Sequence, residues 1–274
     1  MKREKVVGII PARYGSERFP GKVLYEVRGR TILQHAFENA RGIKALSAVY
    51  IATDSEKIRA VAAKFGAEIL MTSDACRSGS DRIAEAARSL DASIIVNLQA
   101  DEPFLPNEAV EKPLALMRKD PRIGVATAAT RIRKKDELYD SNVTKVVMDN
   151  DGWALYFSGS LIPLPRVYFN DETVSTSRDV WFYKHLGVYL YRRKWLEIFT
   201  KLPVGFLERT EKLEQLRLLE NGYRIKVGVI AKDSPCIDTL DDIRRLGNRA
   251  EGKGNGKRWT VEGGWQKGQK DRVQ

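Results

Sequence analysis

The sequence predicts an α/β fold, with a mostly parallel sheet, helices on both faces and an inserted antiparallel subdomain. From residue 6 to residue 130, short apolar runs rich in β-branched residues alternate with amphipathic helical patterns, which is typical of a parallel sheet. The tripeptide Asn150-Asp151-Gly152 then separates two strand-like runs. It is a strong hairpin signal and indicates antiparallel strands inserted into that sheet.

The first half of the chain supplies the parallel elements. Val6–Ile10 suits a strand buried on both faces, and Thr31 is a suitable N-cap for a helix over 32–40. Further strands are expected at 48–53, 67–71, 93–98 and 124–130. Further helices are expected after Asp54-Ser55, from Ser80 as N-cap, and over 106–118 with a bend at Pro113.

The second half predicts the inserted and closing elements. We expect hairpin strands at 144–148 and 153–157, later strands at 186–191 and 224–230, one helix over 206–221, and a final helix capped by Thr239. Residues 1–250 are interpreted as one domain, with an inserted acceptor or dimerisation subdomain at about 140–200. Residues 251–274 are a basic, Gly-rich tail for which disorder is expected.

Composition limits the function classes. A hydrophobic content of 43% and a charged content of 30% describe an ordinary globular protein, and neither a membrane-spanning stretch nor an export signal is recognised, so we expect a cytoplasmic protein without membrane insertion. Cys76 and Cys236 have no metal-ligand spacing. The net charge of +11 fits an anionic substrate, a solvated basic surface or nucleic acid. Nucleic acid is the least favoured, because no nucleic-acid-reading motif accompanies the charge.

The loop after the first strand carries a cluster of cations. The loop carries Arg13, Arg18 and Lys22, and the hydroxyl of Ser16 lies between them in the sequence. Such a loop can gather N–H groups and cations around a polyphosphate, although a solvated basic loop is the plainer alternative. The Walker pattern fails because Gly15 and Gly21 lie one residue too far apart, and the dinucleotide pattern is absent.

Asp101 is a candidate Mg²⁺ ligand, and Asp238 is a second carboxylate of interest. Asp101 follows the apolar run at 93–98, where open α/β sheets bind ligands, and Mg²⁺ favours one or two carboxylates together with substrate phosphates. Local capping is the alternative for Asp101, and it is the plain interpretation of Asp238, which precedes Thr239. Glu102 is expected to cap or pair locally.

Several motifs together resemble the CMP-Kdo synthetases (3-deoxy-manno-octulosonate cytidylyltransferases), which are sugar nucleotidyltransferases. Each motif is weak alone, but their order along the chain is specific, and the resemblance runs from the first strand to about residue 248. The motifs are P-A-R-x-x-S-x-R-x-P-G-K at 11–22, S-G-S-D-R at 78–82, Q-A-D-E-P at 99–103, K-V-V at 145–147, A-L-Y-F-S at 154–158, H-L-G-x-Y at 185–189, L-E-Q-L-R at 213–217 and D-T at 238–239.

The resemblance implies a Rossmann-like nucleotidyltransferase sheet and a role for each matching residue. It implies that the triphosphate of CTP is held by Arg13, Ser16, Arg18 and Lys22. It implies that the base or ribose contacts Ser78, Gly79, Ser80 and Arg82. It implies that Asp101 and Asp238 bind Mg²⁺ and act in catalysis with Arg13 and Lys22. It implies that the sugar acid is surrounded by Gln99, Arg166, His185, Tyr189, Glu214 and Gln215.

The implied reaction is attack by the anomeric hydroxyl of a 3-deoxy-2-ulosonic acid, most simply Kdo, on the α-phosphorus of CTP, with release of pyrophosphate for lipopolysaccharide biosynthesis. One departure stands out, because relatives carry an arginine where this chain has Gly159. Arg166, Arg178 or Lys184 could replace that cation, the acceptor could be a modified Kdo or another acidic sugar, or acceptor binding could be weakened. A homodimer is implied as well, and a nucleotide-binding relative without catalysis is the alternative from another class.

Overall fold

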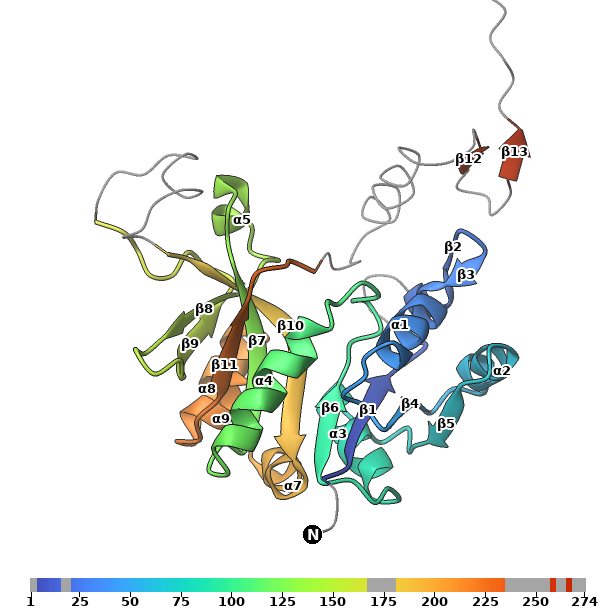
Figure 1. Cartoon of the computed structure of the whole chain (residues 1–274), viewed down its shortest axis with the longest axis horizontal. Coiled ribbons are helices and arrows are strands. Elements are labelled where there is room, and N and C mark those ends of the chain that lie inside the picture. The colour runs from blue at the N-terminus through green and yellow to red at the C-terminus, as the bar shows by residue number, and fades with distance from the viewer. Residues whose placement is uncertain (1–3, 16–20, 167–180, 235–256, 260–264, 268–274) are drawn as a thin grey trace, which may run out of the picture.

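The computed structural model describes residues 4–15, 21–166, 181–234, 257–259 and 265–267. One nine-stranded sheet organises this part of the chain (Figure 1). Seven strands follow the order β11-β7-β10-β6-β1-β4-β5, and β8 and β9 extend from β10. The strands of this sheet are β1 Val6–Pro11, β4 Ala48–Thr53, β5 Glu68–Met71, β6 Ile94–Asn97, β7 Val125–Arg131, β8 Lys145–Met148, β9 Ala154–Ser158, β10 Tyr183–Arg192 and β11 Lys226–Ile230.

Helices connect most of these strands. They are α1 Ile32–Arg41, α2 Glu56–Lys64, α3 Gly79–Ala87, α4 Glu108–Lys119, α5 Lys135–Tyr139, α7 Arg193–Lys201, α8 Phe206–Glu211 and α9 Leu216–Glu220, with a 3₁₀ turn, η1, at Lys22–Leu24. Two small pairs lie apart from the main sheet: β2 Glu26–Val27 with β3 Arg30–Thr31, and β12 Lys257–Trp259 with β13 Trp265–Lys267.

Parallel pairing dominates the seven-stranded path from β11 to β5, as predicted, whereas β8 and β9 pair antiparallel. β6, β1, β4 and β5 pair in parallel, and β11 pairs in parallel with β7. β10 lies between these two blocks and runs antiparallel to both β6 and β7. Its register against β7 shifts between Leu186 and Tyr189, so Gly187 and Val188 form a bulge.

Apolar side chains fill both faces of the sheet. One cluster packs α1, α2 and α4 against the strands through residues such as Phe37, Ile58 and Leu114. The other packs α3, α7 and α9 against the opposite face through residues such as Ile83, Phe199 and Leu216. Both faces are therefore covered, which explains why β1 is apolar throughout and β6 is apolar up to its last residue, Asn97. Within the described residues, no helix is long and apolar enough to cross a membrane.

Most predicted elements are confirmed, and two local predictions are wrong. The N-cap of α3 is Ser78, whose hydroxyl accepts a hydrogen bond from the Asp81 amide at 3.1 Å, whereas the predicted cap, Ser80, lies inside the helix. The single helix predicted over 206–221 is two helices, because Lys212 adopts the left-handed conformation (φ 58°) after α8.

The hairpin prediction is confirmed by β8 and β9, which meet at a turn where Gly152 has φ 77°. Through the pairing of β8 with β10, this hairpin is continuous with the main sheet. The predicted helix after Thr239 lies outside the described residues, as does most of the predicted tail.

Candidate active site

A cavity of about 590 Å³ opens at the carboxyl ends of β1 and β6. Its walls come from the loop after β1, the start of α3, the segment after β6, the bulged part of β10 and the break between α8 and α9. It collects most of the residues that the sequence predicted for the site. These are Arg13, Lys22, Ser78, Gly79, Ser80, Arg82, Gln99, Asp101, His185, Tyr189, Glu214 and Gln215.

The loop after β1 brings Lys22 to the first candidate Mg²⁺ ligand. Lys22 is buried, and its Nζ lies 2.9 Å from Oδ2 of Asp101. The chain turns into this position at Gly21, whose φ of 72° favours glycine and whose amide bonds the Tyr14 carbonyl. Arg13 also lines the cavity. Cationic groups therefore gather where a polyphosphate was predicted, while Ser16 and Arg18 lie outside the described residues.

The first turn of α3 forms the adjoining wall. Ser78 and Gly79 present the start of the helix to the cavity, where free N–H groups favour polar or anionic ligands. The guanidinium of Arg82 is already held, by Asp54 at 2.7 Å and by the Thr72 hydroxyl at 2.5 Å. Arg82 therefore fixes the base of this wall, with its guanidinium already bonded to other parts of the fold.

The bulge of β10 orients His185. The Thr127 hydroxyl donates its hydrogen to the Val188 carbonyl at 2.6 Å, so its oxygen accepts from Nε2 of His185 at 3.0 Å. This arrangement assigns the proton to Nε2 and leaves Nδ1 as an acceptor. The rings of Phe157 and Tyr189 lie 5.1 and 5.2 Å from the imidazole. Burial lowers the pKa of His185 to about 3, so the ring is neutral near pH 7.

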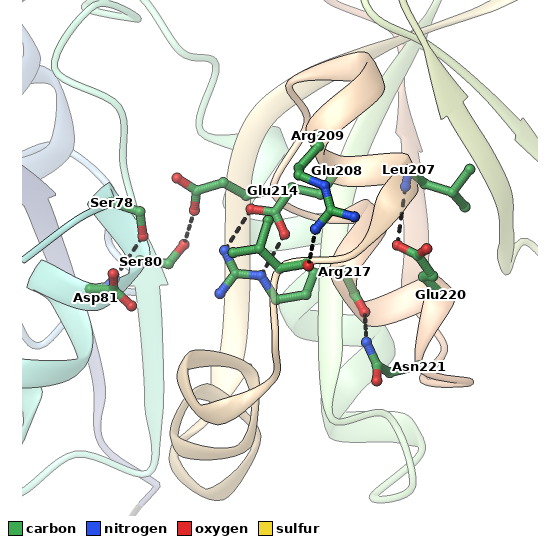
Figure 2. A network of polar contacts seen from close by, with 11 residues as sticks. Ser78, Ser80, Asp81, Leu207, Glu208, Arg209, Glu214, Arg217, Glu220 and Asn221 are labelled. Atoms are coloured by element: carbon green, nitrogen blue, oxygen red, sulfur yellow. Dashed lines mark hydrogen bonds and ion pairs between the residues drawn. The ribbon is translucent and has the colours of Figure 1, made fainter.

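The break between α8 and α9 supplies the wall opposite α3 (Figure 2). Ser80 donates a hydrogen bond to Oε2 of Glu214 at 2.7 Å across 134 residues of sequence. Burial raises the pKa of Glu214, since little water solvates its charge. Within the described residues, the buried amide nitrogen of Gln215 has no hydrogen-bond partner, so it is available to a bound ligand.

A buried ion pair holds this break in place. Arg217 of α9 donates two hydrogen bonds to the carboxylate of Glu208 in α8, at 2.6 and 2.5 Å (Figure 2). The guanidinium also lies 5.1 Å from the centre of the Phe199 ring. The pair therefore fixes the angle between the two short helices, and with it the segment from Lys212 to Gln215.

Some predicted residues are not brought to the cavity. Arg166 is exposed and is absent from the lining, and Asp238 lies outside the described residues. Glu102 does not cap locally as expected: Oε1 accepts a hydrogen bond from the Gly187 amide at 2.8 Å, 85 residues away. Burial, with the neighbouring charge of Asp101, raises the pKa of Glu102 to about 7. This carboxyl group therefore ties the segment after β6 to the bulge in β10.

Sequence reasoning missed several lining residues. Asn97, Arg77 and Lys212 all face the cavity. Asn97 is a polar residue at the carboxyl end of an otherwise apolar strand, and this pattern indicates a ligand-facing position. Lys212 directly precedes the L-E-Q-L-R motif, but the prediction of an unbroken helix hid its position.

The carboxylate of Asp101 suits a Mg²⁺ ion that binds together with the phosphates of a nucleotide. Among the described residues, no group of three or more His, Cys, Asp or Glu side chains could hold a metal. Asp101 contributes one hard oxygen ligand, partly exposed at the cavity wall. One carboxylate completed by phosphate oxygens and water is an arrangement typical of Mg²⁺.

This α/β sheet, with cations and a carboxylate at its carboxyl edge, has the architecture of a nucleotidyltransferase. The family model described as cytidylyltransferase matches residues 7–225. The chain therefore belongs to the cytidylyltransferase family.

Curated relatives and a solved structure narrow the comparison. An 8-amino-3,8-dideoxy-manno-octulosonate cytidylyltransferase from Shewanella amazonensis is 45% identical over 88% of this chain and 96% of its own length. A 3-deoxy-manno-octulosonate cytidylyltransferase from Solibacter usitatus is 42% identical over 92% of this chain and 99% of its own. The structure of a CMP:2-keto-3-deoxy-manno-octonic acid synthetase complexed with CTP superposes with a TM-score of 0.81 and 35% identity. It covers 91% of this chain and 99% of that one.

Proposed function

We propose that this protein transfers CMP from CTP to a 3-deoxy-2-ulosonic acid of the Kdo type, releasing pyrophosphate, as a step in lipopolysaccharide biosynthesis. The main support is one cavity that joins the cationic loop after β1 to the polar, hydrogen-bonding wall formed by β10 and the break between α8 and α9. A nucleotide triphosphate suits the first part, and a hydroxyl-rich sugar suits the second. The cytoplasmic location expected from the sequence and the homodimer implied by the resemblance belong to the same proposal.

The reaction forms a bond from the anomeric oxygen to the α-phosphorus and breaks the bond to the leaving pyrophosphate. Arg13 and Lys22 would offset the negative charge that grows on the pyrophosphate. His185, neutral and fixed by Thr127, would accept a hydrogen bond from a sugar hydroxyl through Nδ1. These residues orient two substrates in one cavity, which is the main requirement of a direct displacement.

Mg²⁺ is proposed as the cofactor, with Asp101 and Asp238 as its protein ligands. When bound, the ion would neutralise phosphate charge and orient the reacting oxygens. Asp101 lies in the described cavity and is held 2.9 Å from Lys22, which supports a common role for the two groups at one part of the nucleotide.

Kdo and its 8-amino derivative are both candidate acceptors. Relatives named for both sugars match nearly the whole chain, at 42% and 45% identity. Both acids share the carboxylate and the anomeric hydroxyl and differ at carbon 8, so the same chemistry applies to either.

Pyrophosphate release tests the proposal. The purified protein is assayed with CTP and MgCl₂ against Kdo, 8-amino-3,8-dideoxy-Kdo and a sialic acid, with other nucleotides as controls. We expect turnover that requires both CTP and one of the two Kdo-type acids and that stops with EDTA. CTP binding without turnover on any ulosonic acid would instead identify a nucleotide-binding relative that has lost catalysis.

A further inference from the structure

Position 159 cannot supply a side chain in this chain's conformation. A Cβ atom on Gly159 would lie 2.8 Å from the Ser141 carbonyl oxygen, closer than real Cβ contacts. The Gly159 carbonyl accepts a hydrogen bond from buried Lys145 at 2.6 Å, and its amide donates to Glu211 at 3.1 Å. Because the backbone is fixed on both sides, an arginine here would require the segment to move.

The two described cations that the sequence suggested as replacements, Arg166 and Lys184, do not line the cavity. Arg166 is exposed and Lys184 forms an ion pair with Asp233 at 3.0 Å, and neither is among the lining residues. Arg178 lies outside the described residues. Among the described residues, a cation for the acid group must therefore come from the residues that line the cavity.

Lys212 lies at the break between α8 and α9, on the cavity wall that also carries Glu214 and Gln215. It lines the cavity beside Leu213, Glu214 and Gln215. It directly follows Glu211, whose carboxylate accepts hydrogen bonds from the Gly159 amide and, at 2.7 Å, from the Ser158 hydroxyl. The backbone of Lys212 is thus anchored next to the position where the resembled family carries its arginine.

The other lining cations belong to other parts of the cavity. Lys22 pairs with Asp101, and Arg82 pairs with Asp54. Arg13 lies on the loop after β1, and Arg77 precedes α3. Within the described part of the chain, Lys212 is therefore the lining cation of the wall formed by β10, α8 and α9, and its ammonium forms no ion pair with a described residue.

A carboxylate bound on this wall needs such a cation, because the same segment carries the acidic side chain of Glu214. We infer that Lys212 binds the carboxylate of the sugar acid and so determines specificity for acidic acceptors, replacing the arginine that Gly159 lacks. This inference rests on the proposed function. Lysine and carboxylate form a charge-assisted hydrogen bond, which is stronger than a neutral one.

Steady-state kinetics of Lys212 variants test the inference. Lys212→Met removes the charge and keeps the length, whereas Lys212→Gly removes the whole side chain and suits the left-handed backbone at φ 58°. We expect both to raise KM for the acceptor by about 10-fold or more, the effect of losing a hydrogen bond between charged groups. KM for CTP should stay within about 2-fold, and Lys212→Arg should retain most of the affinity. The matched control is Lys201→Met, an exposed lysine in α7 that does not line the cavity.

The outcomes separate this inference from the proposed function. Turnover by the wild-type protein tests the function alone. If the wild type is active and Lys212→Met keeps the acceptor KM, the inference is wrong and the function stands. A change in KM for CTP, or a loss confined to Kdo and not shared by its 8-amino derivative, would also overturn it, because the carboxylate is common to both acids.

Discussion

The buried ion pair between Glu208 and Arg217 offers the sharpest test of how this site is built. The two residues are 8% and 6% exposed and share two hydrogen bonds of 2.6 and 2.5 Å. Glu208→Gln keeps the shape of the side chain but leaves the guanidinium buried without its counter-charge. Breaking a buried pair in this way costs about 3–5 kcal/mol. Because an amide oxygen can still accept one hydrogen bond, we expect a loss near the lower end of this range.

The loss is measurable as a lower melting temperature. For a domain of this size, 1 kcal/mol corresponds to roughly 2–4 °C, so Glu208→Gln should lower Tm by roughly 6–12 °C. Thermal denaturation followed by circular dichroism measures this, and urea unfolding gives the free energy. The control is Glu197→Gln, an exposed residue of α7, for which a change within about 0.5 kcal/mol is expected. A Glu208→Gln protein that melts within about 1 °C of the wild type would refute the reasoning.

Three further predictions concern the cavity and the core. Lys22→Ala and Asp101→Asn should each lower kcat for pyrophosphate release by on the order of 100-fold or more, with circular dichroism unchanged; near-normal turnover by either would remove both residues from the catalytic assignment. Since burial lowers the pKa of His185 from 6.5 to about 3, folding should release a proton below pH 6.5, and the unfolding free energy should fall as pH drops below that value. NMR of the His185 ring should show no titration between pH 5 and 8, and a midpoint near 6.5 would contradict the burial argument. Gly124→Ala would place a Cβ atom 2.0 Å from the Trp195 ring, so we expect it to destabilise the protein by about 1–3 kcal/mol in urea unfolding, and an unchanged midpoint would show that Trp195 moves without cost.

Local patterns predicted the fold well, because burial on both faces leaves a clear signal. The strand Val6–Pro11 and the helix capped by Thr31 lie where hydrophobic runs and capping residues indicated. The hairpin at Asn150-Asp151-Gly152 is likewise set by the turn itself. Each of these elements is determined by residues close together in sequence.

The errors arose where distant residues decide the structure. The helix after Phe206 breaks at Lys212, although its hydrophobic spacing continues, and Glu208 and Arg217 fix the break through a contact that periodicity does not reveal. Ser80 looked like a cap, but Glu214, 134 residues later, accepts its hydrogen bond. Glu102 was expected to act locally and instead contacts Gly187. The residues of the cavity were predicted through the resemblance, whereas the position of Lys212 in it depends on the break after α8, which no local pattern indicates.

The central position of β10 has a consequence for how the chain folds as it leaves the ribosome. Tyr189 pairs with Asn97, and Tyr191 pairs with both Ile95 and Val125, so β6 keeps an open, apolar edge until residues beyond 190 have been synthesised. Unpaired apolar edges associate with other chains, and such long-range pairings form slowly. The interval between the emergence of β6 and that of β10 is therefore the stage of synthesis at which the edge of β6 is open to incorrect pairing.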